Sequence, residues 1–199
     1  MRIAVLVSGS GSNLQALIDG CRSGYIPGQI VLVVSSKPDV YALARAAKEK
    51  IDAVVIEKKN YEDETAFTED MLKALDDKKV DLVCLAGYLL RIAPEIINAY
   101  RNRIINIHPA LLPSYGGKGM YGLRVHEAVL AGGDKYTGCT VHFVDEKYDH
   151  GTIIMQEKVP VLEGDTPETL AERVLEEEHK LFPKAVRAFV LKEIKCNIE

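Results

Sequence analysis

Short segments that are apolar on both faces constrain the fold of this chain more than any other feature. Residues 3–7 read Ile-Ala-Val-Leu-Val and residues 82–86 read Leu-Val-Cys-Leu-Ala. Strands without a polar face are typical of parallel sheets that helices cover on both sides. Longer amphipathic stretches separate these segments along the first half of the chain. This half therefore predicts an open, mostly parallel, Rossmann-like α/β sheet.

The expected elements follow from this alternation. We expect strands at residues 2–7, 30–35, 53–57, 81–86 and 104–107, and helices from about residue 13, at 40–49, at 62–78 and from residue 94. Residues 139–144 and 153–161 are rich in β-branched side chains and alternate partially, which predicts later strands in a mixed sheet. Asp165-Thr166-Pro167-Glu168 is a helix start, and that helix should run to about residue 190 or kink at Pro183.

Length and composition favour a single domain over two small ones. The 199 residues are 47% hydrophobic, enough for one core, and the net charge of −4 includes no long basic run. Bulk electrostatics therefore does not favour nucleic acid or an anionic membrane as a partner. The apolar run at residues 3–7 is too short for a signal sequence, and no segment approaches the ~20 apolar residues of a membrane span. We expect a cytoplasmic protein.

Cysteine and histidine spacing disfavours a metal site. Cysteines occur without a C-x-x-C pair, which argues against a disulfide framework or a zinc knuckle. The histidines outside the Asn-x-His segment lack a ligand spacing such as H-E-x-x-H, so no metal is expected. Of these, His142 is expected to have a structural or supporting role. The residues considered are Cys21, Cys84, Cys139, Cys196, His126, His142, His150 and His179.

The segment Gly9-Ser10-Gly11-Ser12-Asn13 follows the first strand and opens the first helix. Exposed N–H groups and the helix dipole favour an anion at such a position. Leu14 stands where a dinucleotide fingerprint needs glycine, and a Walker loop would need Gly-Lys-Ser/Thr. A single phosphate monoester fits better than NAD or ATP. The alternative is a plain turn in which Ser12 or Asn13 caps the helix.

Asn106 and His108 alternate with Ile105 and Ile107 at the end of a strand, so both polar side chains face the same way. An amide can donate a hydrogen bond to a developing oxyanion, and an imidazole can donate or shuttle a proton. The alternative is a pair of hydrogen-bonded polar residues without a chemical role. Nearby, Pro113 is a candidate for a cis peptide bond.

Asp149 lies in an acidic loop between the two late strands. A charge run in such a loop is usually solvated and inert. Sequence distance alone does not bring this carboxylate to His108.

Motifs in order along nearly the whole chain resemble the phosphoribosylglycinamide formyltransferase family of folate-dependent enzymes. Asn-x-His-Pro with Asp-x-Gly marks the wider folate formyltransferase group, and Gly-Ser-Asn marks the glycinamide ribonucleotide branch. The matching segments are residues 9–13, 85–88, 106–113, 117–122, 141–144 and 149–151. The resemblance implies a single formyltransferase domain over residues 1–199, with a nucleotide-binding half at 1–110 and a folate and loop half with the C-terminal helix at 111–199.

The resemblance also implies a reaction: transfer of the formyl group of 10-formyltetrahydrofolate to the amine of phosphoribosylglycinamide. The products are formylglycinamide ribonucleotide and tetrahydrofolate, in de novo purine (IMP) biosynthesis. Asn106 and His108 would stabilise the formyl oxygen. Asp149 would raise the pKa of His108, favour its protonated form and hold a water that relays a proton.

Binding residues are implied in the same way. The substrate phosphate would rest on Gly11, Ser12 and Asn13, and Glu178 would hold the amine, although Glu176-Glu177-Glu178 alone reads as a solvated helix face. Lys118, in a loop that could fold over the ribonucleotide, is a further hypothesis for the phosphate or the folate tail. The implied folate contacts are Leu89, Leu90, Arg91, Ile92, Asn106, Asp145, Glu146, Lys147 and Tyr148.

Departures from the family pattern affect the folate tail alone. The family commonly has an arginine at the position of Leu90, whereas here the arginine is the next residue, Arg91. Glu64 stands near the position where some members have an arginine that contacts the folate.

Alternative functions within the same group are those of methionyl-tRNA formyltransferase, sugar-nucleotide N-formyltransferase and formyltetrahydrofolate deformylase. The first and last usually carry an added domain for which this chain has no room. A non-catalytic module that binds phosphorylated metabolites would need the glycine-rich segment alone. We expect small-molecule substrates and a monomer or homodimer.

Overall fold

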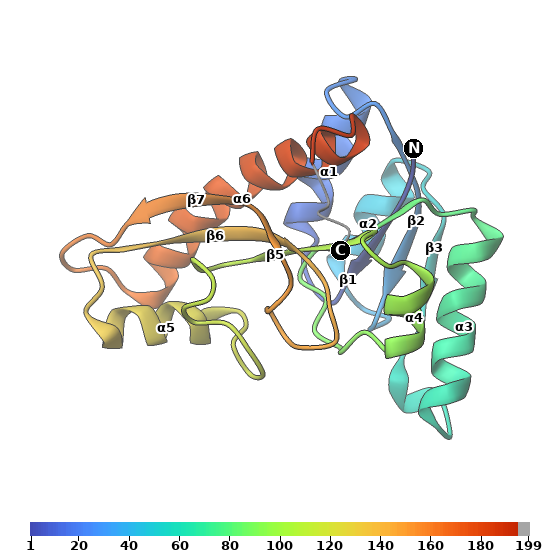
Figure 1. The fold of residues 1–199 in the computed structure, drawn as a ribbon, viewed down its shortest axis with the longest axis horizontal. Helices are drawn as coiled ribbons and strands as arrows, with labels where there is room; N and C mark the ends of the chain where they lie inside the picture. The colour runs from blue at the N-terminus through green and yellow to red at the C-terminus, as the bar shows by residue number, and fades with distance from the viewer. Residues whose placement is uncertain (195–199) are drawn as a thin grey trace.

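A computed structural model describes residues 1–194; Cys196 lies outside this range. One mixed sheet runs through the molecule in the order β3-β2-β1-β4-β5-β6-β7 (Figure 1). The first five strands are parallel, whereas β6 pairs antiparallel with β5 and with β7. The strands are β1 (Arg2–Val7), β2 (Gln29–Ser35), β3 (Ala53–Val55), β4 (Leu82–Leu85), β5 (Ile104–His108), β6 (Tyr136–Phe143) and β7 (Ile153–Pro160). The predicted mixed α/β sheet is confirmed.

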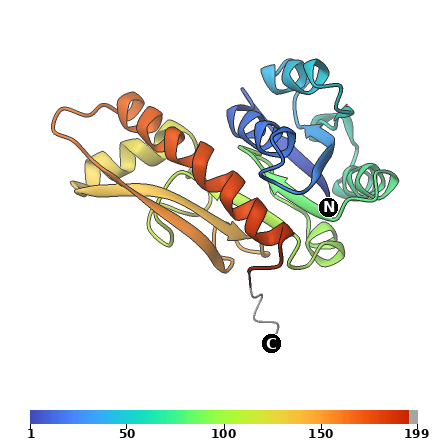
Figure 2. The ribbon, with the colours of Figure 1, turned by 90° about the horizontal axis from the view of Figure 1, so that it is seen from above.

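Helices cover both faces of the parallel part of this sheet, whereas α5 and α6 lie on one face of β6 and β7, as Figure 2 shows from above. The helices are α1 (Ser12–Arg22), α2 (Tyr41–Lys48), α3 (Glu64–Asp77), α4 (Pro94–Ala99), α5 (Leu123–Gly132) and α6 (Pro167–Val190), with a short 3-10 turn at Lys58–Asn60. In β1, Ile3 and Val5 belong to the core that contains side chains of α1, α2, α5 and α6, whereas Ala4 and Leu6 belong to the core that contains side chains of α3 and α4. Successive side chains of one strand thus enter different cores, which explains why the strand has no polar face.

Helix α6 begins and continues as the sequence predicts. Thr166 caps it, and the Thr166 and Thr169 side chains bond reciprocally to each other's backbone N–H groups. The helix passes through Pro183 and packs against α1, α5, β6 and β7. It therefore ties the parallel half of the sheet to the antiparallel half.

The structure departs from the prediction between residues 115 and 140. Helix α5 was not predicted, and β6 begins at Tyr136 rather than at residue 139. Gly138 lies inside that strand because a Cβ there would approach the Glu157 carbonyl oxygen to 1.9 Å. The Leu112–Pro113 peptide bond is cis, as suggested. No helix within residues 1–194 has the length and hydropathy to cross a membrane.

Candidate active site

Strand pairing places the first two polar side chains of the site. Asn106 on β5 lies opposite His142 on β6, and the Asn106 Nδ2 atom is 3.0 Å from His142 Nε2. The His142 Nδ1 atom lies 2.8 Å from the Phe143 carbonyl oxygen, which can only accept, so Nδ1 carries a proton. Nε2 is then the nitrogen that can accept from the Asn106 amide. This contact orients the amide at the end of the strand.

His142 contributes more to the site than the sequence indicated. Its side chain is buried, and Nε2 also lies 3.6 Å from Asp149 Oδ1. It therefore stands between the amide and the carboxylate. The signal that could have found it is the antiparallel register, which sets His142 directly across from Asn106.

His108, at the end of β5, is 3% exposed. Its Nε2 lies 2.9 Å from the Tyr115 carbonyl oxygen, and its Nδ1 lies 3.6 Å from Asp149 Oδ2. Since the carbonyl can only accept, Nε2 is protonated in both charge states of the ring. Nδ1 is therefore the nitrogen that gains or loses a proton.

Asp149 reaches the site from the loop between β6 and β7. Its Oδ2 accepts a hydrogen bond of 2.9 Å from the Gly117 N–H. Burial would raise the pKa of Asp149, but the pKa is lowered on balance, and the positive charge of protonated His108 and the hydrogen bond from the Gly117 N–H both contribute to this. Asp145 instead accepts from the Lys147 N–H and faces His150. The structure thus brings Asp149, and not Asp145, beside His108.

The expected rise in the pKa of His108 is wrong in its net direction. Burial lowers the pKa of His108, and the opposing effects of Asp149 and the Tyr115 carbonyl do not compensate. The contribution of Asp149 has the predicted sign. The ring therefore favours its neutral form at pH 7, with its Nδ1 lone pair toward the Asp149 carboxylate.

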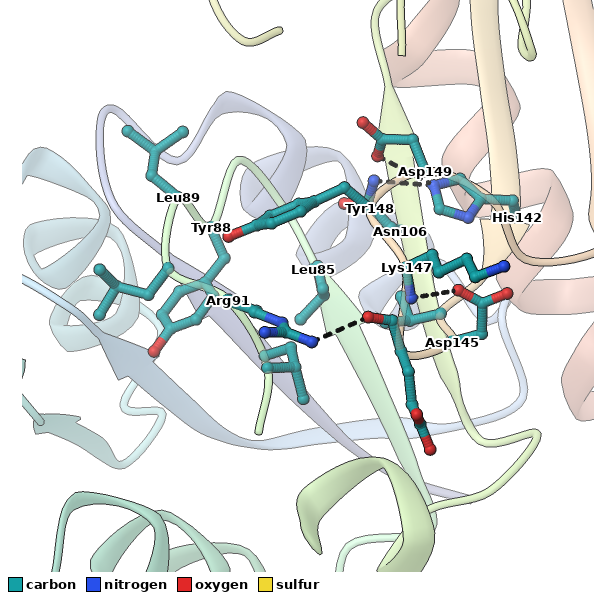
Figure 3. Close-up of a pocket in the computed structure, with 14 residues that line it drawn as sticks. Leu85, Tyr88, Leu89, Arg91, Asn106, His142, Asp145, Lys147, Tyr148 and Asp149 are labelled. Atoms are coloured by element: carbon teal, nitrogen blue, oxygen red, sulfur yellow. Dashed lines mark hydrogen bonds and ion pairs between the residues drawn. The ribbon is translucent and has the colours of Figure 1, made fainter. Parts of the chain in front are cut away.

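A pocket beside this cluster contains every residue predicted to contact folate (Figure 3). It is a pocket that opens to solvent, lined by polar and apolar side chains from both halves of the sheet. Figure 3 shows Arg91 reaching the loop between β6 and β7, where its Nη2 donates to the Glu146 carbonyl at 3.1 Å. Its lining is Leu85, Tyr88, Leu89, Leu90, Arg91, Ile92, Asn106, His142, Val144, Asp145, Glu146, Lys147, Tyr148 and Asp149.

The glycine-rich segment forms the start of α1. Gly11 is the N-cap residue, with φ 71°, so no side chain covers the first turn of the helix. A Cβ on Gly11 would lie 2.7 Å from Ala42 Cβ, which excludes larger residues. The alternative in which Ser12 or Asn13 caps the helix is not what the structure shows. The N–H groups of the first turn are thus left without a side-chain cap, as an anion site at a helix start requires.

Glu178 is buried, contrary to the reading of a solvated helix face. It is 7% exposed, and its Oε2 accepts a 2.6 Å hydrogen bond from Asn13 Nδ2. Burial raises the pKa of Glu178 to about 7, although the Asn13 contact opposes the shift. Asn13 Oδ1 is buried without a hydrogen-bond partner among the described residues. Asn13 therefore connects the start of α1 to this carboxylate.

The two departures from the family pattern lie in different places. Arg91 lines the pocket, whereas Glu64 is exposed at the start of α3 and pairs with Lys58 at 3.1 Å. Glu64 therefore takes no part in the pocket as the structure describes it. No group of three or more His, Cys, Asp or Glu side chains within residues 1–194 is arranged to hold a metal ion.

Comparison with known proteins identifies the family. Residues 1–186 match the model of the formyl transferase family. The chain belongs to this family. Among formyl transferases, it is 45% identical over 195 residues to the chloroplastic phosphoribosylglycinamide formyltransferase of Arabidopsis thaliana, covering 98% of this chain and 67% of that protein. It is 46% identical over 186 residues to the trifunctional purine biosynthetic protein adenosine-3 of Bos taurus, covering 94% of this chain and 18% of that protein.

A solved formyl transferase structure shares this fold over nearly its whole length. Glycinamide ribonucleotide transformylase 1 from Symbiobacterium toebii superposes with a TM-score of 0.92 at 46% identity, covering 98% of this chain and 91% of that chain. The chain thus spans nearly all of this bacterial relative, about two thirds of the plant relative and under a fifth of the bovine one.

Proposed function

We propose that this protein transfers the formyl group of 10-formyltetrahydrofolate to the amine of phosphoribosylglycinamide, a step of de novo purine biosynthesis. The observation that carries the proposal is the convergence of Asn106, His108 and Asp149 at the edge of the sheet where the anion site and the folate-type pocket lie. Relatives named for this reaction support the choice of substrates. Phosphate would rest on Gly11, Ser12 and Asn13.

In the reaction, the neutral amine attacks the formyl carbon and a new C–N bond forms. Negative charge develops on the formyl oxygen, toward which Asn106 Nδ2 and protonated His108 Nδ1 donate hydrogen bonds. This charge, added to that of Asp149, favours the imidazolium form that burial opposes in the ligand-free site. The bond from the formyl carbon to the folate nitrogen then breaks. A proton moves from the attacking nitrogen to the departing one, through a water held by Asp149.

Glu178 would receive the substrate amine. A carboxyl group with a pKa of about 7 is partly ionised at neutral pH and can accept a hydrogen bond from an amine N–H. Asn13 holds this carboxylate beside the anion site, so phosphate and amine of one small molecule would contact neighbouring groups. This arrangement favours a small phosphorylated amine over an amine on RNA.

The test is turnover of defined substrates. The protein is mixed with 10-formyltetrahydrofolate and phosphoribosylglycinamide, and the folate product is followed by absorbance. We expect tetrahydrofolate and the formylated ribonucleotide in equal amounts. Parallel reactions contain an amino-sugar nucleotide, a methionyl-tRNA or no amine. Turnover with one of these, and none with phosphoribosylglycinamide, would overturn the substrate assignment.

A further inference from the structure

We propose that Tyr115 is a positioning residue for His108: its hydroxyl, anchored on Asp134, holds its own carbonyl where it keeps the His108 proton on Nε2. The consequence for turnover rests on the proposed function; the effect on the imidazole does not. Tyr115 does not line the pocket that contains the residues expected to bind folate. Its influence on the chemistry would pass through the ring of His108.

The carbonyl end of this arrangement acts on the proton of the imidazole. The Tyr115 oxygen is 2.9 Å from His108 Nε2, whereas His108 Nδ1 faces Asp149 Oδ2 at 3.6 Å. Without the carbonyl, the neutral ring would prefer its proton on Nδ1, toward the carboxylate. With the carbonyl, the proton stays on Nε2. Nδ1 is then the nitrogen that takes up a proton when the ring becomes an imidazolium. The resulting Nδ1–H can donate a hydrogen bond to the formyl oxygen.

The backbone at Tyr115 is in a conformation that a tyrosine rarely adopts. Its φ is 56°, in the left-handed region, and the residue therefore depends on its surroundings to stay there. The next residue, Gly116, packs against Leu112, and a Cβ at this position would lie 2.6 Å from Leu112 Cδ2. The next residue, Gly117, donates to Asp149. One short turn thus holds both His108 and Asp149.

The hydroxyl end supplies the anchor. Tyr115 Oη donates a 2.6 Å hydrogen bond to Asp134 Oδ2, just beyond the end of α5. This bond raises the pKa of the Tyr115 hydroxyl, which therefore remains a donor. Gly132, the last residue of α5, makes room: a Cβ there would lie 2.3 Å from Tyr115 Oη. The missing side chain at Gly132 is what allows the hydroxyl to reach Asp134.

This geometry gives two independent ways to break the anchor. Tyr115→Phe removes the hydroxyl. Gly132→Ala instead pushes the hydroxyl away from Asp134 through its added methyl group, and alanine itself is favourable in a helix. We expect each change to lower kcat about tenfold while KM for both substrates changes less than twofold, because a small displacement of a catalytic group slows chemistry. Asp134→Asn, which keeps an oxygen acceptor, should retain more activity than either. Tyr136→Phe, on an exposed tyrosine nearby, is the matched control and should leave kcat unchanged.

The double variant sharpens the test. Once Tyr115→Phe has removed Oη, the Cβ of Gly132→Ala meets no atom closer than 3.5 Å, so the second change should add no further loss. Additive losses would show that Gly132→Ala acts on helix α5 and would overturn the anchor. Unchanged kcat in both single variants would overturn it as well.

A spectroscopic measurement separates this proposal from the proposed function. Nitrogen-15 NMR of histidine-labelled protein, with His108→Ala used for assignment, reports which imidazole nitrogen carries the proton at high pH. We expect the Nε2-protonated form of His108 in the native protein and a mixture in Tyr115→Phe. An Nδ1-protonated native ring would refute the anchor, even if the enzyme formylates its substrate. The expected spectra without turnover would refute the proposed function and leave the anchor standing.

Discussion

At the scale of single residues, the proposed mechanism gives proton transfer and charge stabilisation to His108 and Asp149. His108 Nδ1 faces Asp149 Oδ2 at 3.6 Å, and both groups are buried among polar partners. We expect His108→Ala and Asp149→Asn each to lower kcat by at least ~100-fold, the low end for general acid–base groups. Steady-state kinetics with both substrates measures the effect. If either variant has a kcat close to that of the native protein, the residue changed in that variant does not have its assigned role in the mechanism.

Glu178 gives a prediction about stability and pH. Its pKa rises from 4.5 in the unfolded chain to about 7 in the folded one. Across that window the folded chain holds a proton that the unfolded chain has lost, so the contribution of Glu178 to stability is complete below the window and declines as pH rises through it. Glu178→Gln keeps the acceptor for Asn13 and cannot ionise. Its unfolding temperature should therefore rise relative to the native protein between about pH 5 and pH 8.

Thermal denaturation of both proteins across this range measures the difference. Glu176→Gln, on the exposed side of the same helix, is the control and should follow the native curve. Parallel curves for Glu178→Gln and the native protein would show that Glu178 is ionised throughout, as on a solvated face.

At the scale of elements, the start of α1 depends on a glycine that two constraints require. Gly11 has φ 71° and lies against Ala42, whereas Gly24 has φ 76° and open space where a Cβ would lie, with no atom within 4 Å. Gly24→Ala should lower the free energy of unfolding by about 1 kcal/mol, the strain of the left-handed region. Gly11→Ala adds a collision with α2 and should lower it by about 2–4 kcal/mol. Urea denaturation measures both free energies of unfolding. Equal decreases for the two variants would mean that α2 moves to accommodate the added methyl group without loss of stability.

The elements that the sequence predicted are those with a local signal. Apolar runs predict the buried strands, and the cap at Thr166 predicts the start of α6. Helix α5 does not: its N-cap is Gly122, without a capping side chain, and it follows a glycine-rich loop. The first residues of β6 were missed because Gly138 weakens the strand pattern, although packing against β7 requires it.

The site divides in the same way between local and tertiary signals. The spacing of Asn106 and His108 on one strand is local and indicated a shared face. The proximity of Asp149, the burial of Glu178 and the part played by Tyr115 depend on contacts between distant segments. Family resemblance supplied the proximity of Asp149 and an amine-binding role for Glu178 as expectations, but not the burial of Glu178. Tyr115 had no signal in the sequence, because its contact to His108 is made by a backbone carbonyl.

At the scale of the whole molecule, each ligand should stabilise the fold through its own part of the site. A ligand at about 100 times its Kd adds about 2.7 kcal/mol to the stability of the folded state, which for a domain of this size raises Tm by about 5–10 °C. Phosphoribosylglycinamide would bridge α1 and α6 through Asn13 and Glu178, whereas the folate would join the segment after β4 to the loop between β6 and β7. We expect each ligand alone to raise Tm by this amount.

A charge introduced at the start of α1 should separate the Tm shift caused by phosphoribosylglycinamide from the shift caused by folate. Ser12→Asp places a carboxylate in the first turn of α1, where the helix dipole favours it, so the ligand-free protein should be at least as stable as the native one. The same carboxylate repels a phosphate, so the Tm shift with phosphoribosylglycinamide should disappear while the shift with folate persists. Arg91→Ala, at the other end of the site, should reduce the folate shift and leave the ribonucleotide shift intact. If Ser12→Asp retained its full ribonucleotide shift, the start of α1 would be a plain turn, and the phosphate would bind elsewhere.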